Sequence, residues 1–422
     1  MSLVLIVADS VRHDALGCGR STPRGGGPSP FALPCLPHTP TVDSLADQGV
    51  LFERTISSAP WTLPSLGSML TGIYAHRLGL ARWDQPWPSD YENLFNLARQ
   101  AGCEVASFVF DPDHLFCRVP EACVCGSSQD TEGVLAWLRA HRHEQFFALI
   151  HYWWTHIPYV DRPMSTAAWR LMTDEVLAAL RAGPAARAGV QRLYGHAIER
   201  FSEVWLPRVL QAVDLDQCWL SIIADHGESW GERSPESVPG DVFDLHGNAL
   251  HEEVLRVPWI IRAPGGMNGR RIPELVRNVD VMPTLASLLG WRKGPWPNDL
   301  DGIDVAGALD TGSVGESLDA ISVRNHDCIT TALRPTTAKE LYPAFALTGP
   351  RWRQIWELGT DRWQAFDLLC DPGELCDLGH PPELAAGASR LQAELARARV
   401  GEFLDDSAAE VASRLRQWGY LE

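Results

Sequence analysis

Three short apolar segments of the chain are each followed by polar residues that could hold a metal ion or transfer a proton. Asp9 follows LVLIVA, His151 and His156 follow FFALI, and Asp225 and His226 follow WLSIIA. A neighbouring carboxylate and imidazole, as in Asp225-His226, present oxygen and nitrogen ligands together. An aspartate at the end of a single strand is more often a solvated turn residue, so a metal site requires that these segments meet in the fold.

A candidate nucleophile lies in the segment SSAPWTLPSLGSMLTG, residues 57–72. Thr62 precedes Pro64, and apolar residues follow at helical spacing from Ser65 onward. Pro near the start of a helix is ordinary, so one interpretation makes this threonine a helix N-cap. The other makes it an attacking hydroxyl beside a helix N-terminus, whose N–H groups and partial positive charge favour a bound anion. Both interpretations stay open on these residues alone.

The pattern of the chain predicts a scaffold that brings these distant segments together. Apolar runs bounded by turn signals alternate with stretches of helical spacing, which predicts an α/β fold with a large, mostly parallel sheet and helices on both faces. Ligands of such sheets bind beyond the carboxyl ends of the strands, so we expect the polar residues at one edge. The predicted strands are 3–8, 104–110, 146–151, 219–224 and 257–262, and the helical stretches include 91–100, 131–139 and 191–213.

The character of the chain changes after Trp291. Short strand patterns near 321–324, 344–347 and 354–356 precede two amphipathic helical stretches near 382–398 and 405–418. We therefore predict a catalytic domain over residues 1–315 and a smaller C-terminal α+β subdomain over residues 316–422. The Gly- and Pro-rich segment 17–40 is predicted to form a long loop that either walls the site or is a surface insertion.

Composition and charge limit the partners of the protein. The 422 residues give a formal net charge of −17, which repels phosphate polymers and anionic lipid, so we expect neither a nucleic-acid polymer nor a membrane as partner. The apolar run 3–8 is too short to span a bilayer and has no basic flank or cleavage site. We expect a cytoplasmic protein whose ten cysteines are thiols. Cys117, Cys123 and Cys125 lack the paired spacing of structural zinc sites.

Seven stretches, taken in order, resemble the sulfatase-like branch of the alkaline phosphatase superfamily, and the resemblance covers essentially the whole chain. The stretches are VLIVADSVRHDALG, HTPTVDSLADQGVLFERTISSAPWTLPSLGSMLTGIYAHRLG, FALIHYWWTHIPY, IIADHGESWGE, HGNALHEEVLRVPWIIRAPG, VDVMPTLASLLG and FDLLCDPGELCDL. Any one of them is weak evidence, but seven in the family's order make a chance match very improbable. The resemblance implies the alkaline phosphatase/sulfatase-like fold.

The resemblance also implies a metal site. The family's ligand positions fall on Asp9, Asp225 and His226, and Thr62 takes the nucleophile position, where a threonine oxygen also reaches the metal. Trp154 replaces an Asp that supports a second ion in two-metal relatives, so we expect one divalent metal per chain. Mn²⁺ or Zn²⁺ fits these mixed ligands better than Ca²⁺ or Mg²⁺, which prefer oxygen ligands.

Two further histidines match family positions that face the substrate. His156 lies in HYWWTHIPY, where the second His contacts the anionic group or protonates the leaving group, and His246 begins HGN. We therefore expect His156 and His246 to be catalytic. His251 matches a position that is often Tyr and is expected to be structural, as is an ion pair between Arg12 and Asp14.

Departures from the family pattern indicate the reaction. Formylglycine sulfatases carry Cys or Ser, then x-Pro-x-Arg, whereas this chain has Thr62 followed by Leu66 at the Arg position, and Ser10 replaces a second Asp. The resemblance thus favours hydrolysis of a phosphoester or phosphodiester through Thr62. A sulfuric ester hydrolase acting without formylglycine and a non-catalytic binding relative remain as alternatives. The substrate is expected to be a small anionic ester, and the oligomeric state stays open. Aromatic walls suited to a sugar, nucleoside or aryl group are predicted from Trp83, Trp87, Trp153 and Trp154.

Overall fold

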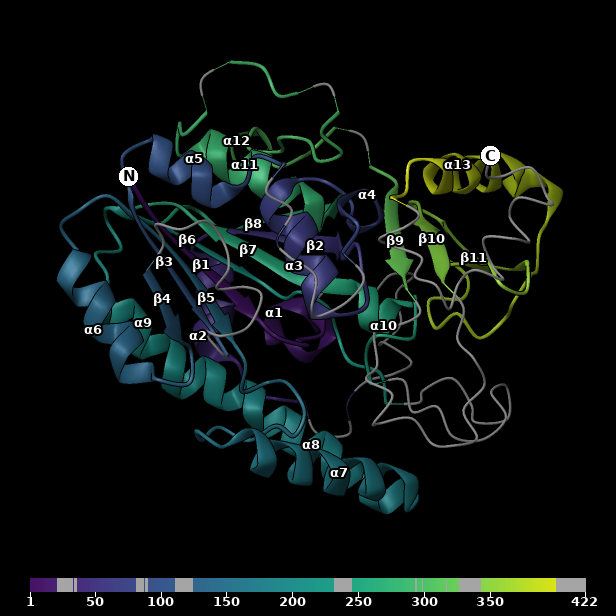
Figure 1. Cartoon of the computed structure of the whole chain (residues 1–422), viewed down its shortest axis with the longest axis horizontal. Coiled ribbons are helices and arrows are strands. Elements are labelled where there is room, and N and C mark those ends of the chain that lie inside the picture. The colour runs from purple at the N-terminus through teal and green to yellow at the C-terminus, as the bar shows by residue number, and fades with distance from the viewer. Residues whose placement is uncertain are drawn as a thin grey trace.

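An eight-stranded sheet in the order β4-β3-β5-β1-β6-β7-β2-β8 forms the centre of the computed structural model (Figure 1). The structure describes residues 1–20, 33, 36–80, 87, 90–110, 124–230, 245–292, 294–297, 299–315, 317–325 and 343–399. The strands are β1 (Ser2–Ala8), β2 (Val50–Ile56), β3 (Glu104–Val109), β4 (Val124–Ser127), β5 (Phe146–Tyr152), β6 (Cys218–Ile223), β7 (Arg256–Arg262) and β8 (Arg270–Arg277).

Most of the sheet is parallel, as the sequence predicts. Strands β4, β3, β5, β1 and β6 pair in parallel, whereas β7 runs antiparallel to both β6 and β2, and β2 pairs in parallel with β8. The direction of β7 does not follow from its apolar pattern. Strands β1 and β5 are buried along their whole length, which explains their continuous apolar sequences.

Helices cover both faces of the sheet (Figure 1). The helices α3, α5 and α11 lie on one face, and α2, α6 and α9 lie on the other. The helices are α1 (Gly17–Arg20), α2 (Pro40–Asp47), α3 (Thr62–Thr71), α4 (Ala75–Leu78), α5 (Leu94–Gln100), α6 (Thr131–His141), α7 (Thr166–Arg181), α8 (Pro184–Arg200), α9 (Leu206–Ala212), α10 (Glu252–Leu255), α11 (Val281–Leu288), α12 (Ala308–Thr311) and α13 (Ala385–Ala396). A π-helical turn at Phe201–Trp205 joins α8 to α9, so the predicted helix 191–213 is continuous.

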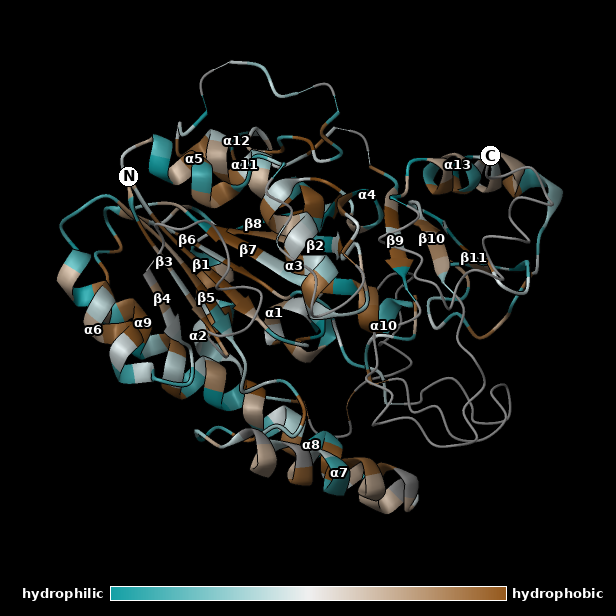
Figure 2. Cartoon of the chain, viewed as in Figure 1, coloured by the Kyte–Doolittle hydropathy of each residue, from teal (hydrophilic) through white to brown (hydrophobic). Residues whose placement is uncertain are grey.

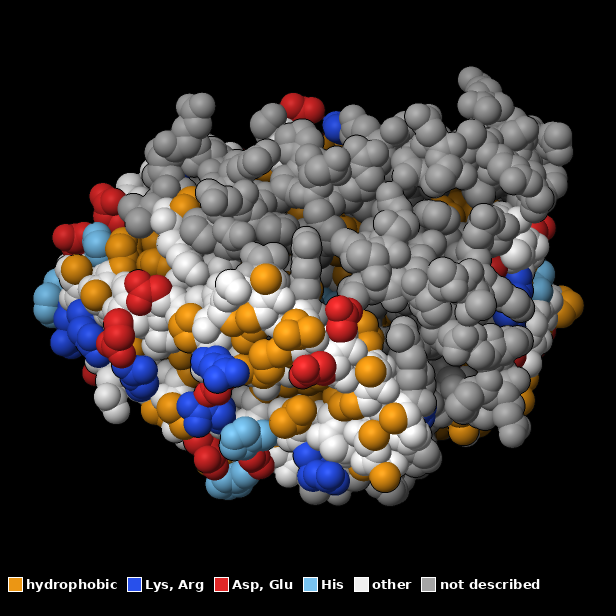
Figure 3. All heavy atoms as spheres, turned by 60° about the horizontal axis from the view of Figure 1, so that its bottom comes forward, with side chains coloured by type: hydrophobic (Ala, Val, Ile, Leu, Met, Phe, Trp, Pro, Cys, Tyr) orange, Lys and Arg blue, Asp and Glu red, His pale blue; other side chains and the backbone are white. Residues whose placement is uncertain are grey.

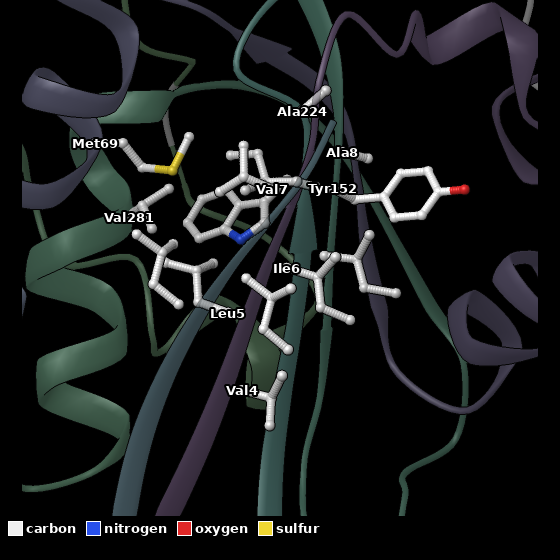
Figure 4. Packing of buried hydrophobic residues seen from close by; sticks show 14 of the residues in the cluster. Val4, Leu5, Ile6, Val7, Ala8, Met69, Tyr152, Ala224 and Val281 are labelled. Carbon is white, nitrogen blue, oxygen red and sulfur yellow. The ribbon is translucent and has the colours of Figure 1, made fainter. Parts of the chain in front are cut away.

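The hydrophobic core lies between the sheet and these helices. Figure 2 shows the central strands as mainly hydrophobic, and Figure 4 shows side chains of β1 packed beside Met69 of α3 and Val281 of α11. Full burial of each large aliphatic side chain contributes roughly 1.5–3 kcal/mol before the entropy of ordering it is subtracted. The core therefore holds the carboxyl ends of β1, β5 and β6 in fixed relative positions.

A second sheet lies in the C-terminal part, as predicted. Its four antiparallel strands β9 (Ala320–Arg324), β10 (Ala344–Thr348), β11 (Trp352–Glu357) and β12 (Arg362–Asp367) are ordered β12-β11-β10-β9, and α13 packs against β10 and β11. The Val323 N–H donates to the Ser58 carbonyl at 2.8 Å, which ties this sheet to the large one. The division at residue 315 stays a prediction. The predicted helix 405–418 lies outside the described residues.

Strand β2 is an element that the apolar pattern did not predict. Its sequence VLFERTI contains Glu53 and Arg54, which interrupt the apolar run. Both charges are satisfied by long-range contacts: Arg54 donates to the carbonyls of Gly349 and Pro350, and Glu53 pairs with Arg271 at 3.4 Å. Partners so distant in sequence explain why local patterning misses the strand.

Helices α1, α7 and α8 lie outside the central sheet. Of the predicted loop 17–40, residues 17–20 form α1 and most of the remainder lies outside the described residues. The hairpin of α7 and α8 exposes Leu171 and Leu193, and Figure 3 shows hydrophobic side chains among charged ones on the face that it brings forward. Within the described residues, no helix is long and apolar enough to cross a membrane.

Candidate active site

The carboxyl ends of β1 and β6 bring Asp9, Asp225 and His226 together. Asp9 directly follows β1, and the Asp225-His226 pair begins two residues after the last residue of β6, on the neighbouring strand. All three side chains are buried, and their candidate ligand atoms lie within 4.8 Å of one another. In the described part of the chain this is the one group of His, Cys, Asp and Glu residues with such an arrangement.

One oxygen of each carboxylate is fixed by hydrogen bonds. Asp225 Oδ1 accepts from the backbone N–H groups of Ser10 at 3.1 Å and His226 at 2.9 Å, and Asp9 Oδ1 accepts from the Ser10 hydroxyl at 2.6 Å. Ser10 has a φ of 58°, a left-handed backbone conformation that turns the chain at the end of β1. Asp225 Oδ2 is buried and has no hydrogen-bond partner among the described residues.

Burial and mutual repulsion both oppose the ionisation of Asp9 and Asp225. Burial raises the pKa of Asp225, and the charge of Asp9 raises it further. Burial also opposes ionisation of Asp9, but the charge of His156 and the hydrogen bond and charge of His151 hold its pKa below the usual value. A cation between two buried carboxylates would offset both desolvation and repulsion, so this donor set fits a divalent metal ion.

The tautomer of His226 suits metal binding. Its Nδ1 lies 2.9 Å from the Gly227 carbonyl oxygen, which can only accept, so Nδ1 carries the hydrogen. The other ring nitrogen, Nε2, is left with its lone pair on the side of the carboxylates, 3.4 Å from Asp225 Oδ2. Fixing one imidazole nitrogen by a carbonyl is the usual way in which a metal-binding histidine is oriented.

Thr62 reaches this cluster from α3. Its Oγ1 lies 3.3 Å from His226 Nε2 and 3.5 Å from Asp9 Oδ2. Trp61 occupies the N-cap position, and Thr62 is the first residue of the helix, so the interpretation of Thr62 as an N-cap is wrong. The hydroxyl is therefore directed at the cluster while the helix N-terminus lies beside it.

Buried hydrogen bonds fix the start of α3 against the end of β6. The hydroxyls of Ser57 and Ser65 each donate to the Asp225 carbonyl at 2.6 Å, and the Asn278 amide donates to Ser65 Oγ at 2.9 Å. These contacts set the position of Thr62 relative to the two carboxylates.

His151 also lies in the cluster, although the sequence placed it only at a strand end. Its Nε2 is 2.9 Å from Asp9 Oδ2 and 3.8 Å from Asp225 Oδ2. Burial lowers the pKa of His151, but the hydrogen bond and charge of Asp9 outweigh burial and raise it. His151 thus helps to balance the negative charge of the site.

His156 and His246 come from different segments and lie close together. Their ring centroids are 4.9 Å apart, and the His246 ring is 4.7 Å from that of His226. The Nδ1 of His156 donates to the Ile157 carbonyl at 2.6 Å, and its ring stacks on Trp153 at 4.0 Å. Burial lowers the pKa of His156 to about 3. The structure thus brings both predicted catalytic histidines to the cluster.

Glu228 is a site residue that the sequence analysis missed. It is fully buried, and its two carboxylate oxygens lie 2.8 Å from His246 Nδ1 and 2.8 Å from the hydroxyl of Tyr159. Burial lowers the pKa of His246, but the charge and hydrogen bond of Glu228 outweigh burial and raise it. The only sequence signal was the position of Glu228 two residues after the predicted ligand His226.

The residues predicted to be structural make structural contacts. His251 Nδ1 lies 3.2 Å from Glu374 in the C-terminal part, and Arg12 pairs with Asp14 at 2.8 Å. Among the predicted aromatic residues, Trp87 and Trp154 are buried and Trp83 lies outside the described residues. Cys117 and Cys123 also lie outside them, and Cys125 is exposed on β4.

The sequence of the chain is similar to that of known sulfatases. A family model described as Sulfatase matches residues 2–115 and 127–291, which is more than half of the chain. The ulvan-active sulfatase of Formosa agariphila is 24% identical over 63% of this chain and 51% of its own length. The chain thus spans about half the length of that curated relative.

Solved structures share the fold over nearly the whole chain. The phosphonate monoester hydrolase of Agrobacterium radiobacter has a TM-score of 0.68 at 19% identity, covering 93% of this chain and 95% of that chain. A protein in complex with its substrate D-glucosamine-2-N,6-O-disulfate has a TM-score of 0.65 at 15% identity, covering 98% of each. These matches show the same fold in a phosphonate monoester hydrolase and in a protein whose substrate is a sulfated sugar.

Proposed function

We propose that this chain, which belongs to the sulfatase family, hydrolyses a phosphoester or phosphodiester with Thr62 as the nucleophile. The proposal is carried by the position of Thr62 Oγ1, 3.5 Å from Asp9 Oδ2 and 3.3 Å from His226 Nε2 at the start of α3. A hydroxyl beside a cation site and a helix N-terminus is placed to attack an anionic ester. The substrate is a small anionic molecule in this proposal.

Four residues would hold one divalent ion: Asp9, Thr62, Asp225 and His226. The combination of carboxylate, imidazole and hydroxyl donors suits Mn²⁺ or Zn²⁺ best. When bound, such an ion polarises a non-bridging oxygen of the ester and lowers the pKa of a coordinated hydroxyl. Family members use a divalent metal, and the buried Asp225 Oδ2, which has no hydrogen-bond partner among the described residues, supports a metal here as well.

The residues of the chain carry the covalent steps. The Thr62 hydroxyl loses its proton to solvent, its oxygen bonds to phosphorus, and the bond to the leaving oxygen breaks. An imidazole, His156 or His246, gives a proton to that leaving oxygen. Water then attacks the phospho-threonine, the same imidazole takes a proton from the water, and Thr62 recovers its own from solvent. The helix terminus stabilises the charge that develops on the equatorial oxygens.

Sulfate-ester hydrolysis is the second candidate, because the similar proteins include an ulvan-active sulfatase and a protein whose substrate is a sulfated sugar. Formylglycine sulfatases use an aldehyde hydrate made from Cys or Ser, and this chain has Thr62 with Leu66 at the Arg position. Activity on sulfate would therefore require direct attack by Thr62. Two carboxylates kept buried at a desolvation cost count against a non-catalytic binding protein.

A substrate panel with two threonine variants tests the proposal. Aryl phosphate, phosphodiester, phosphonate and sulfate esters are offered to the metal-reconstituted protein, to Thr62→Ala and to Thr71→Ala. Thr71 lies at the other end of α3, where its hydroxyl donates to the Gly67 carbonyl at 2.7 Å and accepts from the Ile73 N–H at 3.2 Å. We expect a phosphorus ester to be the best substrate, Thr71→Ala to keep activity, and Thr62→Ala to lose at least about a thousandfold, or roughly 4 kcal/mol of barrier. Near-native rates in Thr62→Ala, or far faster turnover of sulfate esters, would overturn the phosphoryl-transfer proposal.

A further inference from the structure

We propose that Glu228 is a positioning residue that makes His246 the proton donor to the leaving group. The inference rests on the proposed ester hydrolysis and chooses between its two candidate imidazoles. It is based on the hydrogen bonds around Glu228 and on the place of the His246 ring in the cluster.

Both oxygens of Glu228 have a donor. Oε1 lies 2.8 Å from His246 Nδ1, and Oε2 accepts from the Tyr159 hydroxyl at 2.8 Å. An ionised carboxylate can only accept, so the hydrogen of the His246 ring must be on Nδ1. The free ring position, Nε2, is then the one available to exchange a proton with substrate. His156 is different, because its Nδ1 donates to the backbone carbonyl of Ile157 and not to a carboxylate, which forms the stronger, charge-assisted hydrogen bond.

The His246 ring belongs to the same cluster as the candidate nucleophile. It is 4.7 Å from the ring of His226, and the Nε2 of His226 is 3.3 Å from Thr62 Oγ1. The Glu228 side chain is fully buried, whereas His246 keeps 18% of its side chain exposed. Glu228 is therefore the sealed member of the pair, and His246 is the partly exposed one.

The backbone around Glu228 and His246 is fixed from several directions. The Arg12 guanidinium donates to the Glu228 carbonyl at 3.1 Å, and the Gly247 N–H donates to the Pro60 carbonyl at 2.7 Å. A side chain at Gly227 would have its Cβ 2.1 Å from the Glu253 carbonyl oxygen, so only glycine permits this close approach. The Tyr159 ring packs against those of Tyr194 and Trp230. Glu228 therefore has little freedom to choose another partner.

The proton balance of the step is simple. As the bond between phosphorus and the leaving oxygen breaks, the proton on His246 Nε2 moves to that oxygen, and the imidazole is left neutral with its hydrogen on Nδ1. In the second half of the reaction, Nε2 takes a proton from the attacking water, which restores the imidazolium. Glu228 holds the ring in place through both steps and exchanges no proton.

A leaving-group series separates this role from a structural one. Esters of good leaving groups, such as 4-nitrophenol, need little protonation, whereas alkyl esters depend on it. We expect Glu228→Gln to lower kcat for the alkyl ester by about ten- to a thousandfold with little change in KM, and to affect the 4-nitrophenyl ester much less. Tyr159→Phe is the matched control, because it removes the other hydrogen bond to the same carboxylate and leaves that of His246. We expect Tyr159→Phe to lower the rates of both esters by the same small factor.

A spectroscopic measurement tests the orientation without turnover. In the Zn²⁺-reconstituted protein with ¹⁵N-labelled histidine, His246→Asn identifies the His246 signals. We expect a downfield Nδ1–H proton in the native protein that is lost or shifts upfield in Glu228→Gln and persists in Tyr159→Phe, with unchanged zinc content in both. An unaltered Nδ1–H signal in Glu228→Gln, or equal rate losses for good and poor leaving groups, overturns the role of Glu228. Absence of ester hydrolysis in the native protein would instead overturn the proposed function, and the tautomer would still be measured.

Discussion

The two buried aspartates differ in what surrounds each oxygen. Oδ1 of Asp225 accepts two backbone N–H groups, at 3.1 and 2.9 Å, while Oδ2 is buried without a hydrogen-bond partner among the described residues. A buried carboxylate oxygen with no donor costs free energy unless a cation meets it. The arrangement thus lowers the stability of the metal-free protein and raises its affinity for a metal ion.

Asp225→Asn tests how the charge of Asp225 affects metal affinity and the stability of the metal-free protein. The amide keeps an oxygen that can accept the two N–H groups but removes the charge, so the variant should bind metal much more weakly while the metal-free protein melts no lower than the native one. Elemental analysis after dialysis should find about one metal ion per native chain and much less in the variant. Asp216→Asn, at an exposed position, is the control. Undiminished metal in Asp225→Asn would remove Asp225 from the ligand set, and about two ions per native chain would contradict the single site.

At the scale of elements, the site depends on how α3 is attached to the end of β6. Ser65 donates to the Asp225 carbonyl at 2.6 Å and accepts from the Asn278 amide at 2.9 Å, so one hydroxyl connects α3, β6 and the segment before α11. Ser68, one turn later, donates only within the helix, to the Pro64 carbonyl at 2.8 Å.

Ser65→Ala should therefore destabilise the protein more than Ser68→Ala does. Removing the Ser65 hydroxyl leaves a buried amide with one partner fewer, which costs about 1–3 kcal/mol, whereas loss of the Ser68 contact costs less than about 1 kcal/mol. Urea unfolding of both variants measures the difference. Equal losses would show that the Ser65 connection contributes nothing special to the attachment of α3.

The sequence predicted those parts of the site that depend on strand ends. Asp9, Asp225 and His226 follow apolar strands, and parallel strands with helical crossovers must bring their carboxyl ends to one edge. The family resemblance added Thr62, whose element starts 53 residues from Asp9. Glu228 could not be predicted in the same way, because its role depends on Tyr159 and His246, and their positions follow from tertiary packing.

The sequence was a poorer guide to the direction of β7 and to the presence of β2. The apolar run of β7 is compatible with either direction, and only its pairing with β6 and β2 makes it antiparallel. Strand β2 was missed because Glu53 and Arg54 interrupt its pattern, and their partners Arg271, Gly349 and Pro350 lie more than two hundred residues away. Contacts of this range leave no local signal in the sequence.

At the scale of the whole molecule, buried polar contacts join the C-terminal part to the large sheet. His76 on α4 lies 3.2 Å from Glu394 on α13, and Arg397 bridges Glu394 and Asp301 at 2.8 and 2.7 Å. Burial lowers the pKa of His76 in spite of Glu394. Burial would raise the pKa of Glu394, but His76 and Arg397 outweigh it and lower it. A neutral histidine thus faces an ionised glutamate across this junction.

This junction predicts a pH dependence of stability. In the unfolded chain His76 has the ordinary histidine pKa of about 6.5 and in the folded chain its pKa is lower, so the unfolded state binds more protons as the pH falls below 6.5. The contribution is complete above pH 6.5 and decreases toward the folded pKa, with a slope of at most about 1.4 kcal/mol per pH unit. In His76→Gln, unfolding free energies measured from pH 7.5 to 5 should fall less steeply than in the native protein. His196→Gln, at a side chain that is 66% exposed, serves as control. Parallel curves for the native protein and His76→Gln would contradict this account.

We also propose that the protein works in a reducing, cytoplasmic environment. If its ten cysteines are thiols, protein denatured without oxidation should titrate close to ten thiols, and reductant should leave the melting temperature unchanged. Several disulfides in protein prepared in this way would contradict the proposed compartment.

Rapid acid quench during turnover shows whether Thr62 forms a covalent bond to phosphorus. The native protein is mixed with a saturating phosphorus ester, quenched within the first turnover, digested and analysed by mass spectrometry. The account predicts that the peptide containing Thr62 gains the mass of the substrate's phosphoryl part without its leaving group, and that Thr62→Ala shows no adduct. Turnover of the ester with no adduct on Thr62 under conditions that slow the second step, or an adduct on another residue, would contradict it.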